Sequence, residues 1–130
     1  MSKEAAIAHW VRTAEDDWLT VEVLLSAGRY PQGLFWLHLT IEKLAKALWI
    51  KEHDPDVPPF IHSINRLLTT TSLRLTPAQL ATAAELDLLQ QETRYPDATS
   101  TLYDSLNADE ATRLWAAATE LRQCILSKLP

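Results

Sequence analysis

The stretch PQGLFWLHLTIEKLAKALWIKEHD, residues 31–54, decides the fold of this chain. Its core-forming residues recur at the i, i+3, i+4 and i+7 spacing that places side chains on one side of an α-helix. The residues on this side are Leu34, Leu37, His38, Ile41, Leu44, Ala45, Leu48 and Trp49. The spacing therefore predicts a long amphipathic helix. The same helix carries a dense group of charges, Glu42, Lys43 and Lys46.

The segment before this helix has the same character. Apolar residues at helical spacing predict a first helix over residues 3–27, with Ser2 as its N-cap. Gly28 is suited to the left-handed conformation that ends a helix. The turn over residues 29–33 is so short that the second helix must return antiparallel to the first.

The segment after residue 54 contains three more helical patterns. Prolines keep residues 55–59 extended, and Phe60 and Ile61 are expected to hold this segment against the core. A short helix is predicted from His62 or Ser63, and it should fray in the threonine-rich residues 69–72.

The last two helices have clear start signals. The first of them begins at Thr76, followed by Pro77 and Gln79 in a capping box, and runs to about residue 93. Residues 94–106 show no period and form a long loop. Asn107 then begins the last helix. We predict an all-α fold, an up-and-down four-helix bundle with an additional short helix.

Composition supports one helical domain over residues 1–130. The chain has 47% hydrophobic and 22% charged residues, and only two glycines. A formal net charge of −5 disfavours broad binding to nucleic acid. No run is long enough to span a membrane, and no signal-peptide pattern is visible. A single cysteine, Cys124, excludes an internal disulfide, so a cytoplasmic location is expected.

The charged group on the central helix permits two interpretations. Glu42 and Lys46 are four residues apart in the favourable order, so they can form an ordinary solvated ion pair. Alternatively, one lysine lies at the mouth of a groove and binds phosphate as a point charge.

His38 and Asp17 are polar residues on sides of their helices that are otherwise apolar. His38 is either a core histidine bonded to a neighbour or a pocket residue paired with Glu42 or Asp17. Asp17 requires a partner if it leans inward, because a bare buried carboxylate is too costly. A lysine or a tyrosine hydroxyl would satisfy it.

Two further positions combine a structural and a functional interpretation. His62 either caps the short helix or faces the central helix across a cleft. Arg94 either neutralises a helix C-terminus or, beside Tyr95 in the long loop, acts as an anion ligand. The sequence shows no helical metal motif, no glycine-rich phosphate loop and no catalytic constellation, so neither a metal nor a cofactor is expected.

The order of these polar pieces resembles the HEPN family, the higher eukaryote and prokaryote nucleotide-binding domain. The resemblance rests on five pieces in order: Ala14 to Asp17, Tyr30, the sequence HLTIEKLAKAL over residues 38–48, His62-Ser-Ile64, and RYPD over residues 94–97. It covers most of the chain and is most similar to the stand-alone bacterial type.

The resemblance implies a helical bundle that forms a homodimer. It also implies a nucleotide or other anionic ligand, or a minimal nucleotidyltransferase partner in a toxin–antitoxin-like module. By position, the implied ligand-binding residues are Lys43, Lys46, His62, Arg94 and Tyr95, and the implied supporting residues are Asp17, His38 and Glu42.

One branch of the family consists of ribonucleases marked by an arginine and a histidine separated by four to six residues. Here the corresponding positions after Arg94 are Thr99, Ser100 and Thr101, and no other arginine has a histidine at that spacing. Hydroxyl groups cannot replace an imidazole that titrates near neutrality. A non-catalytic HEPN protein is therefore the leading hypothesis. The alternatives are a metal-independent ribonuclease toxin and a helical adaptor whose polar motif is purely structural.

Overall fold

The computed structural model describes residues 2–94 and 104–130, apart from the side chains of residues 92–94. Its helices are α1 (Lys3–Ser26), α2 (Tyr30–Glu52), α3 (Ile64–Thr69), α4 (Pro77–Arg94) and α6 (Ala108–Leu126). The predicted fold class, an all-α bundle with one short extra helix, is confirmed. No helix in the described part of the chain is long and apolar enough to cross a membrane.

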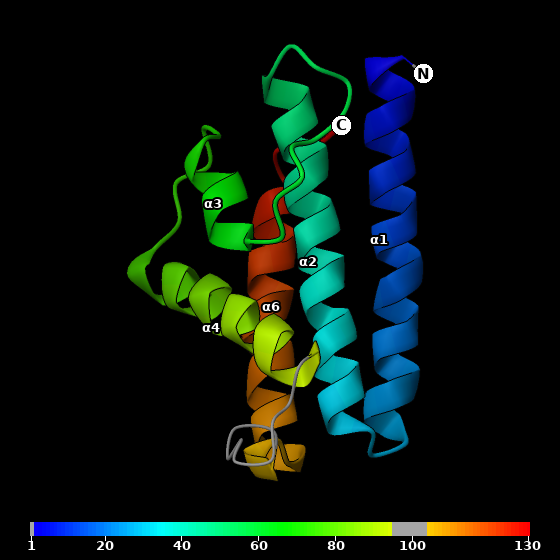
Figure 1. Cartoon of the computed structure of the whole chain (residues 1–130), viewed down its shortest axis with the longest axis vertical. Helices are drawn as coiled ribbons and strands as arrows, with labels where there is room; N and C mark the ends of the chain where they lie inside the picture. Colours follow the sequence, from blue (N-terminus) through cyan, green and yellow to red (C-terminus); the bar gives the residue numbers. More distant parts are fainter. Residues whose placement is uncertain (1, 95–103) are drawn as a thin grey trace.

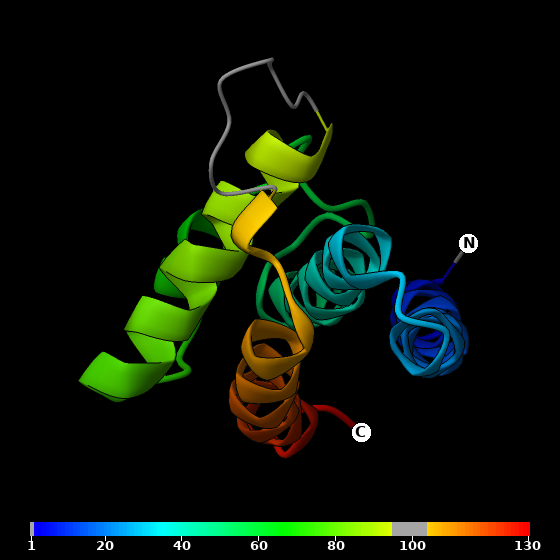
Figure 2. The ribbon, with the colours of Figure 1, turned by 90° about the horizontal axis from the view of Figure 1, so that it is seen from below.

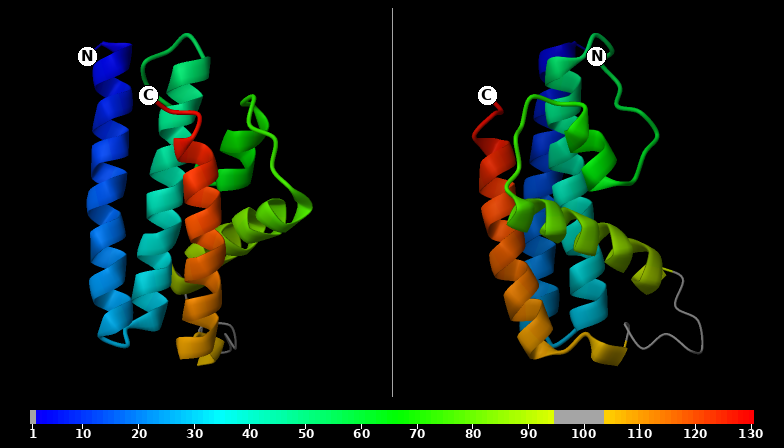
Figure 3. Two further views of the ribbon diagram at one scale, coloured as in Figure 1. Left: turned by 180° about the vertical axis from the view of Figure 1, so that it is seen from behind. Right: turned by 90° about the vertical axis from the view of Figure 1, so that its left-hand side faces the viewer.

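Three of the helices run along the long axis of the molecule, and α4 lies across them (Figure 1). α1 and α2 are antiparallel neighbours joined by a tight turn, as the short connection predicted. Figure 2 shows α2 between α1 on one side and α4 and α6 on the other. The two views in Figure 3 show the same steep crossing of α4 over the axial helices.

α2 is buried on more sides than its amphipathic pattern predicted. The predicted apolar side, represented by Leu37, Ile41 and Leu44, is fully buried in the main core. A second side, with Ala47 and Ile50, is also fully buried and packs against the start of α1. This double burial follows from the position of α2, because α1 covers one side of it while α4 and α6 cover the other.

The residues expected from the sequence to begin and end helices make the expected capping contacts. The Ser2 hydroxyl accepts a hydrogen bond from the Ala5 amide, and Gly28 after α1 has a φ of 77°. Thr76 and Gln79 each accept a bond from the other's backbone amide, at 3.2 and 2.9 Å. Local side-chain chemistry therefore sets these helix ends independently of the tertiary fold.

Two details of the segment between α2 and α3 differ from the sequence prediction. Phe60 does not pack into the core, because its side chain is 95% exposed. Of these two residues, only Ile61 packs against the core. Ser63, not His62, is the N-cap of α3, and its hydroxyl accepts a bond from the Arg66 amide at 3.1 Å. His62 is therefore available for another contact.

α1 reaches α6 through a small group of side chains. The indole rings of Trp18 and Trp115 are stacked, with their centroids 4.1 Å apart. The Arg122 guanidinium lies 4.6 Å from the centre of the Trp18 ring and forms an ion pair with Glu15. Two of the five tryptophans thus join helices within one chain.

The burial of α2 predicts where truncation destabilises the fold most. Leu44→Ala removes a fully buried side chain from the centre of the core, so we expect the free energy of unfolding to fall by about 2–5 kcal/mol. Urea denaturation followed by circular dichroism measures this loss. Leu88→Ala on α4 is the control, since Leu88 is 51% exposed and should cost under about 1 kcal/mol. Equal losses would contradict the assignment of the core.

Candidate functional site

A buried carboxylate on α2 forms the centre of a polar cluster. The Glu42 side chain is only 5% exposed, and its two oxygens face different partners. Oε1 lies 3.2 Å from Nδ1 of His62, and Oε2 lies 3.6 Å from Nζ of Lys46. A carboxylate so far from water requires such partners. Glu42 therefore joins α2 to the segment that precedes α3.

Lys46 is the cation of this cluster that lies deepest. Its side chain is 10% exposed, and its ammonium lies 5.3 Å from the centre of the Trp10 ring on α1. The ring face attracts the charge, and Glu42 on the same helix as Lys46 attracts it as well. Both interactions hold the ammonium in place between α1 and α2.

Lys43 and Asp17 form a separate pair between α2 and α1. Nζ of Lys43 lies 2.5 Å from Oδ2 of Asp17, and both side chains are largely shielded from solvent. The expectation that a lysine satisfies an inward Asp17 is confirmed. The charge of Lys43 is thus balanced within the chain.

His38 is fully buried and faces the start of α3. Its Nε2 lies 3.1 Å from the His62 carbonyl oxygen and 3.3 Å from Oδ1 of Asp87. Both neighbours are acceptors, so Nε2 carries the proton and donates. Of the two interpretations from sequence, the core histidine bonded to a neighbour is right. It pairs with neither Glu42 nor Asp17.

Asp87 on α4 is the residue that sequence reasoning missed. Its carboxylate accepts bonds from the Ser63 hydroxyl at 2.9 Å, the Ile64 amide at 2.8 Å and the Asn65 amide at 3.3 Å. These amides belong to the first turn of α3, where backbone N–H groups have no acceptor within the helix itself. Asp87 therefore supplements the Ser63 cap, because it accepts from first-turn amides of α3 although it belongs to a different helix.

The same contacts determine the ionisation of Asp87. Burial by itself raises the pKa of this carboxyl, but the hydrogen bonds from His38, Ile64, Ser63 and Asn65 outweigh burial. The net effect is a pKa below the ordinary value. Asp87 is ionised at neutral pH and stabilises the start of α3.

A signal for Asp87 was present in the sequence. It lies four residues after Ala83 and next to Leu86, so it falls inside the buried stripe of α4. A carboxylate at such a position needs donors from elsewhere in the fold. The sequence could flag that need, but it could not identify α3 as the source of the donors.

His62 is the part of the cluster that meets solvent. Its side chain is 46% exposed, and its ring packs edge-on against Phe60, with centroids 5.3 Å apart. Nδ1 of His62 faces Glu42, so the other ring nitrogen, Nε2, points away from the Glu42 carboxylate. An imidazole oriented by a carboxylate can donate a hydrogen bond to an anion or exchange a proton with a bound group.

The structure thus brings together four of the eight residues selected from sequence: His38, Glu42, Lys46 and His62. Asp17 and Lys43 form the neighbouring pair. The backbone of Arg94 ends α4, but its side chain and the whole of Tyr95 lie outside the described residues. Within the described part, no group of three or more His, Cys, Asp or Glu side chains is placed to hold a metal ion.

The profile of the HEPN domain family matches residues 7–129. The chain belongs to the HEPN domain family. The match includes α2 with its Glu-Lys-x-x-Lys sequence and the segment that carries His62. The resemblance noted from sequence is therefore confirmed at the level of the family.

Two solved structures have the same fold. TT1696 from Thermus thermophilus aligns with a TM-score of 0.82 at 22% identity, over 95% of this chain and 98% of that chain. ST0689, described as an archaeal HEPN homologue, aligns with a TM-score of 0.72 at 23% identity and the same coverage. At such identities the likeness establishes the fold alone. Comparison with curated proteins gave no significant match.

The role of Asp87 as a cap predicts a pH-dependent stability. Because its folded pKa is lowered, the stabilisation is present above the unfolded pKa, about 3.9, and is lost as pH falls through the folded value. Asp87→Asn should lower the free energy of unfolding by about 1–3 kcal/mol at pH 7. The gap to the wild type should narrow below about pH 4.

Urea denaturation between pH 3 and pH 7 measures this gap. Asp56→Asn serves as the matched control, because Asp56 is an exposed aspartate in the loop before α3. A gap for Asp87→Asn that stays constant across the acid range would show that the ionised carboxylate is not the stabilising form.

Proposed function

We propose that this chain is a non-catalytic HEPN protein that forms a homodimer and binds a nucleotide or another small anion. The proposed ligand-binding residues are Lys43, Lys46, His62, Arg94 and Tyr95, supported by Asp17, His38 and Glu42. A minimal nucleotidyltransferase protein is the proposed partner, in a toxin–antitoxin-like module.

One observation carries the binding proposal: buried Glu42 holds both Lys46 and half-exposed His62. The two donors face the two oxygens of one carboxylate, so Glu42 holds them near each other. Fixed donors lose little conformational entropy when an anion arrives. His62 reaches solvent, and Lys46 contacts the other oxygen of the same carboxylate.

The absence of an arginine–histidine motif from the sequence supports a non-catalytic role. No arginine of the chain is followed by histidine after four to six residues. The ribonuclease alternative would therefore depend on the Glu42–His62 pair, in which a buried carboxylate orients a half-exposed imidazole. Incubation with RNA in the presence of a chelator tests this alternative. Cleavage that disappears in His62→Ala would contradict the non-catalytic proposal.

Calorimetric titration with ATP, GTP and UTP tests the binding proposal. We expect at least one nucleotide to bind in the micromolar range, at about −8 kcal/mol. His62→Gln removes the oriented imidazole, and Arg94→Ala removes the proposed anion ligand, so each should weaken binding about tenfold or more.

His9→Gln is the matched control for that titration, because His9 is an exposed histidine on α1 outside the cluster. Its affinity should equal that of the wild type. A flat titration for all three nucleotides, or an equal loss in the control, would overturn the proposed site.

A specific observation favours a second candidate, the helical adaptor with a structural polar motif. Lys43 is paired with Asp17, and Lys46 is paired with Glu42, so both motif lysines already have acidic partners. On this hypothesis Lys43→Ala lowers the melting temperature but changes no nucleotide affinity. The two measurements on one variant separate the adaptor from the nucleotide-binding protein.

A further inference from the structure

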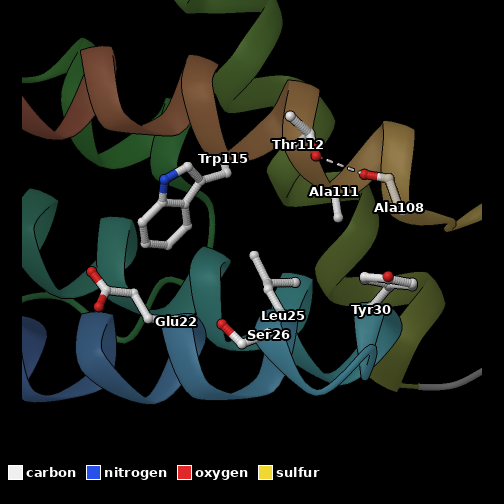
Figure 4. A pocket seen from close by; sticks show the side chains of 8 residues that line it. All are labelled: Glu22, Leu25, Ser26, Tyr30, Ala108, Ala111, Thr112 and Trp115. Carbon is white, nitrogen blue, oxygen red and sulfur yellow. Dashed lines mark hydrogen bonds between the residues drawn. The ribbon is translucent and has the colours of Figure 1, made fainter.

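A groove lies between α1 and α6, close to the turn that joins α1 to α2. It has a volume of about 480 Å³, which is in the range of small-molecule sites. Figure 4 shows the residues that line it: Glu22, Leu25, Ser26, Tyr30, Ala108, Ala111, Thr112 and Trp115. None of them belongs to the Glu42 cluster, so this groove is independent of the proposed function.

The groove exists because the α6 side of the gap carries small side chains, Ala108, Ala111 and Thr112. Ala111 and Ala108 on α6 lie across the groove from Leu25 and Tyr30 (Figure 4). The small side chains of α6 cannot fill the space that separates α1 from α6. The Trp18–Trp115 stack then closes the contact between these helices further along.

The walls of the groove are largely apolar and include two aromatic rings. The Trp115 indole points from α6 into the groove toward the α1 side (Figure 4). Stacking on Trp18 fixes the orientation of that ring. Tyr30 and Leu25 add apolar surface at the other end. The Thr112 hydroxyl donates to the Ala108 carbonyl at 2.9 Å, so its proton is already used.

Glu22 supplies the only full charge among the described residues that line the groove. Its carboxylate is exposed and makes no hydrogen bond or ion pair with any described residue. Figure 4 shows it extending from α1 toward the Trp115 side of the groove. A carboxylate beside an aromatic ring attracts a cation through both charge and the ring quadrupole.

We propose that this groove binds a small organic cation, an amine with a flat apolar body. The body lies against Trp115 and Leu25, and the ammonium pairs with Glu22. The same carboxylate repels phosphates and carboxylic acids. The ligand class of this groove is thus opposite in charge to that of the Glu42 cluster.

Three indoles that differ in charge test this proposal with the whole chain. Tryptamine carries an ammonium, tryptophol is neutral and indole-3-acetate is an anion, while the ring is the same. Calorimetry and the indole N–H signals of ¹⁵N-labelled protein follow binding, with the Trp115 signal assigned from Trp115→Phe. We expect tryptamine to bind most tightly, to shift the Trp115 signal and to weaken as salt rises.

Variants then assign the charge preference to Glu22. Because Glu22 is exposed, Glu22→Gln should weaken tryptamine binding about three- to five-fold and leave tryptophol unchanged. Glu22→Lys should reverse the order, so that indole-3-acetate binds better than tryptamine. Asp16→Asn, an exposed acid on the same helix outside the groove, should have no effect.

Two results would overturn the proposal. The first is no binding of tryptamine, or equal affinities for the three indoles. The second is coverage of the groove by another copy of the chain. Ala108→Leu narrows the groove and should block tryptamine without altering sedimentation. If that variant instead dissociates a dimer, the groove is a self-association surface.

Discussion

The burial of α2 on more than one side is the constraint on which the rest of the structure depends. This one helix contacts α1, α3, α4 and α6, so each of the other described helices packs against it. Its apolar residues supply the centre of the main core, and Ala47 and Ile50 supply a second, smaller one. A helix covered in this way has little solvent-facing surface on which to place polar side chains. The buried charged groups Glu42 and Lys46 on α2 therefore take their partners from within the fold.

These partners organise the segment between α2 and α4. Glu42 binds His62, and His38 binds the His62 carbonyl oxygen, so one residue is held through both its side chain and its backbone. Asp87 then caps α3 from the opposite direction. The short helix α3 would be marginal alone, because six residues provide few internal hydrogen bonds. The polar residues of α2 and α4 thus contribute to the fold as well as to the candidate site.

The family and the local geometry bear on function in different ways. Membership of the HEPN family rests on a match over residues 7–129. The proposed anion site rests on the half-exposed His62 and on Lys46, which contact different oxygens of Glu42. The groove between α1 and α6 has the opposite character, with aromatic walls and one unpaired carboxylate among the described residues that line it. The two regions share no residue, so each can be tested without disturbing the other.

The sequence by itself determined the helices and their ends. Periodicity and capping are local properties, so Ser2, Gly28 and Thr76 marked boundaries that the structure reproduces. Polar residues inside apolar stripes, such as Asp17 and His38, were also identifiable. Only the tertiary structure decided their partners. Glu42 meets His62 across 20 positions of sequence, and Asp87 meets Ile64 across 23. The Asp87 pairing depends on how α4 crosses the bundle, and no local pattern encodes that direction.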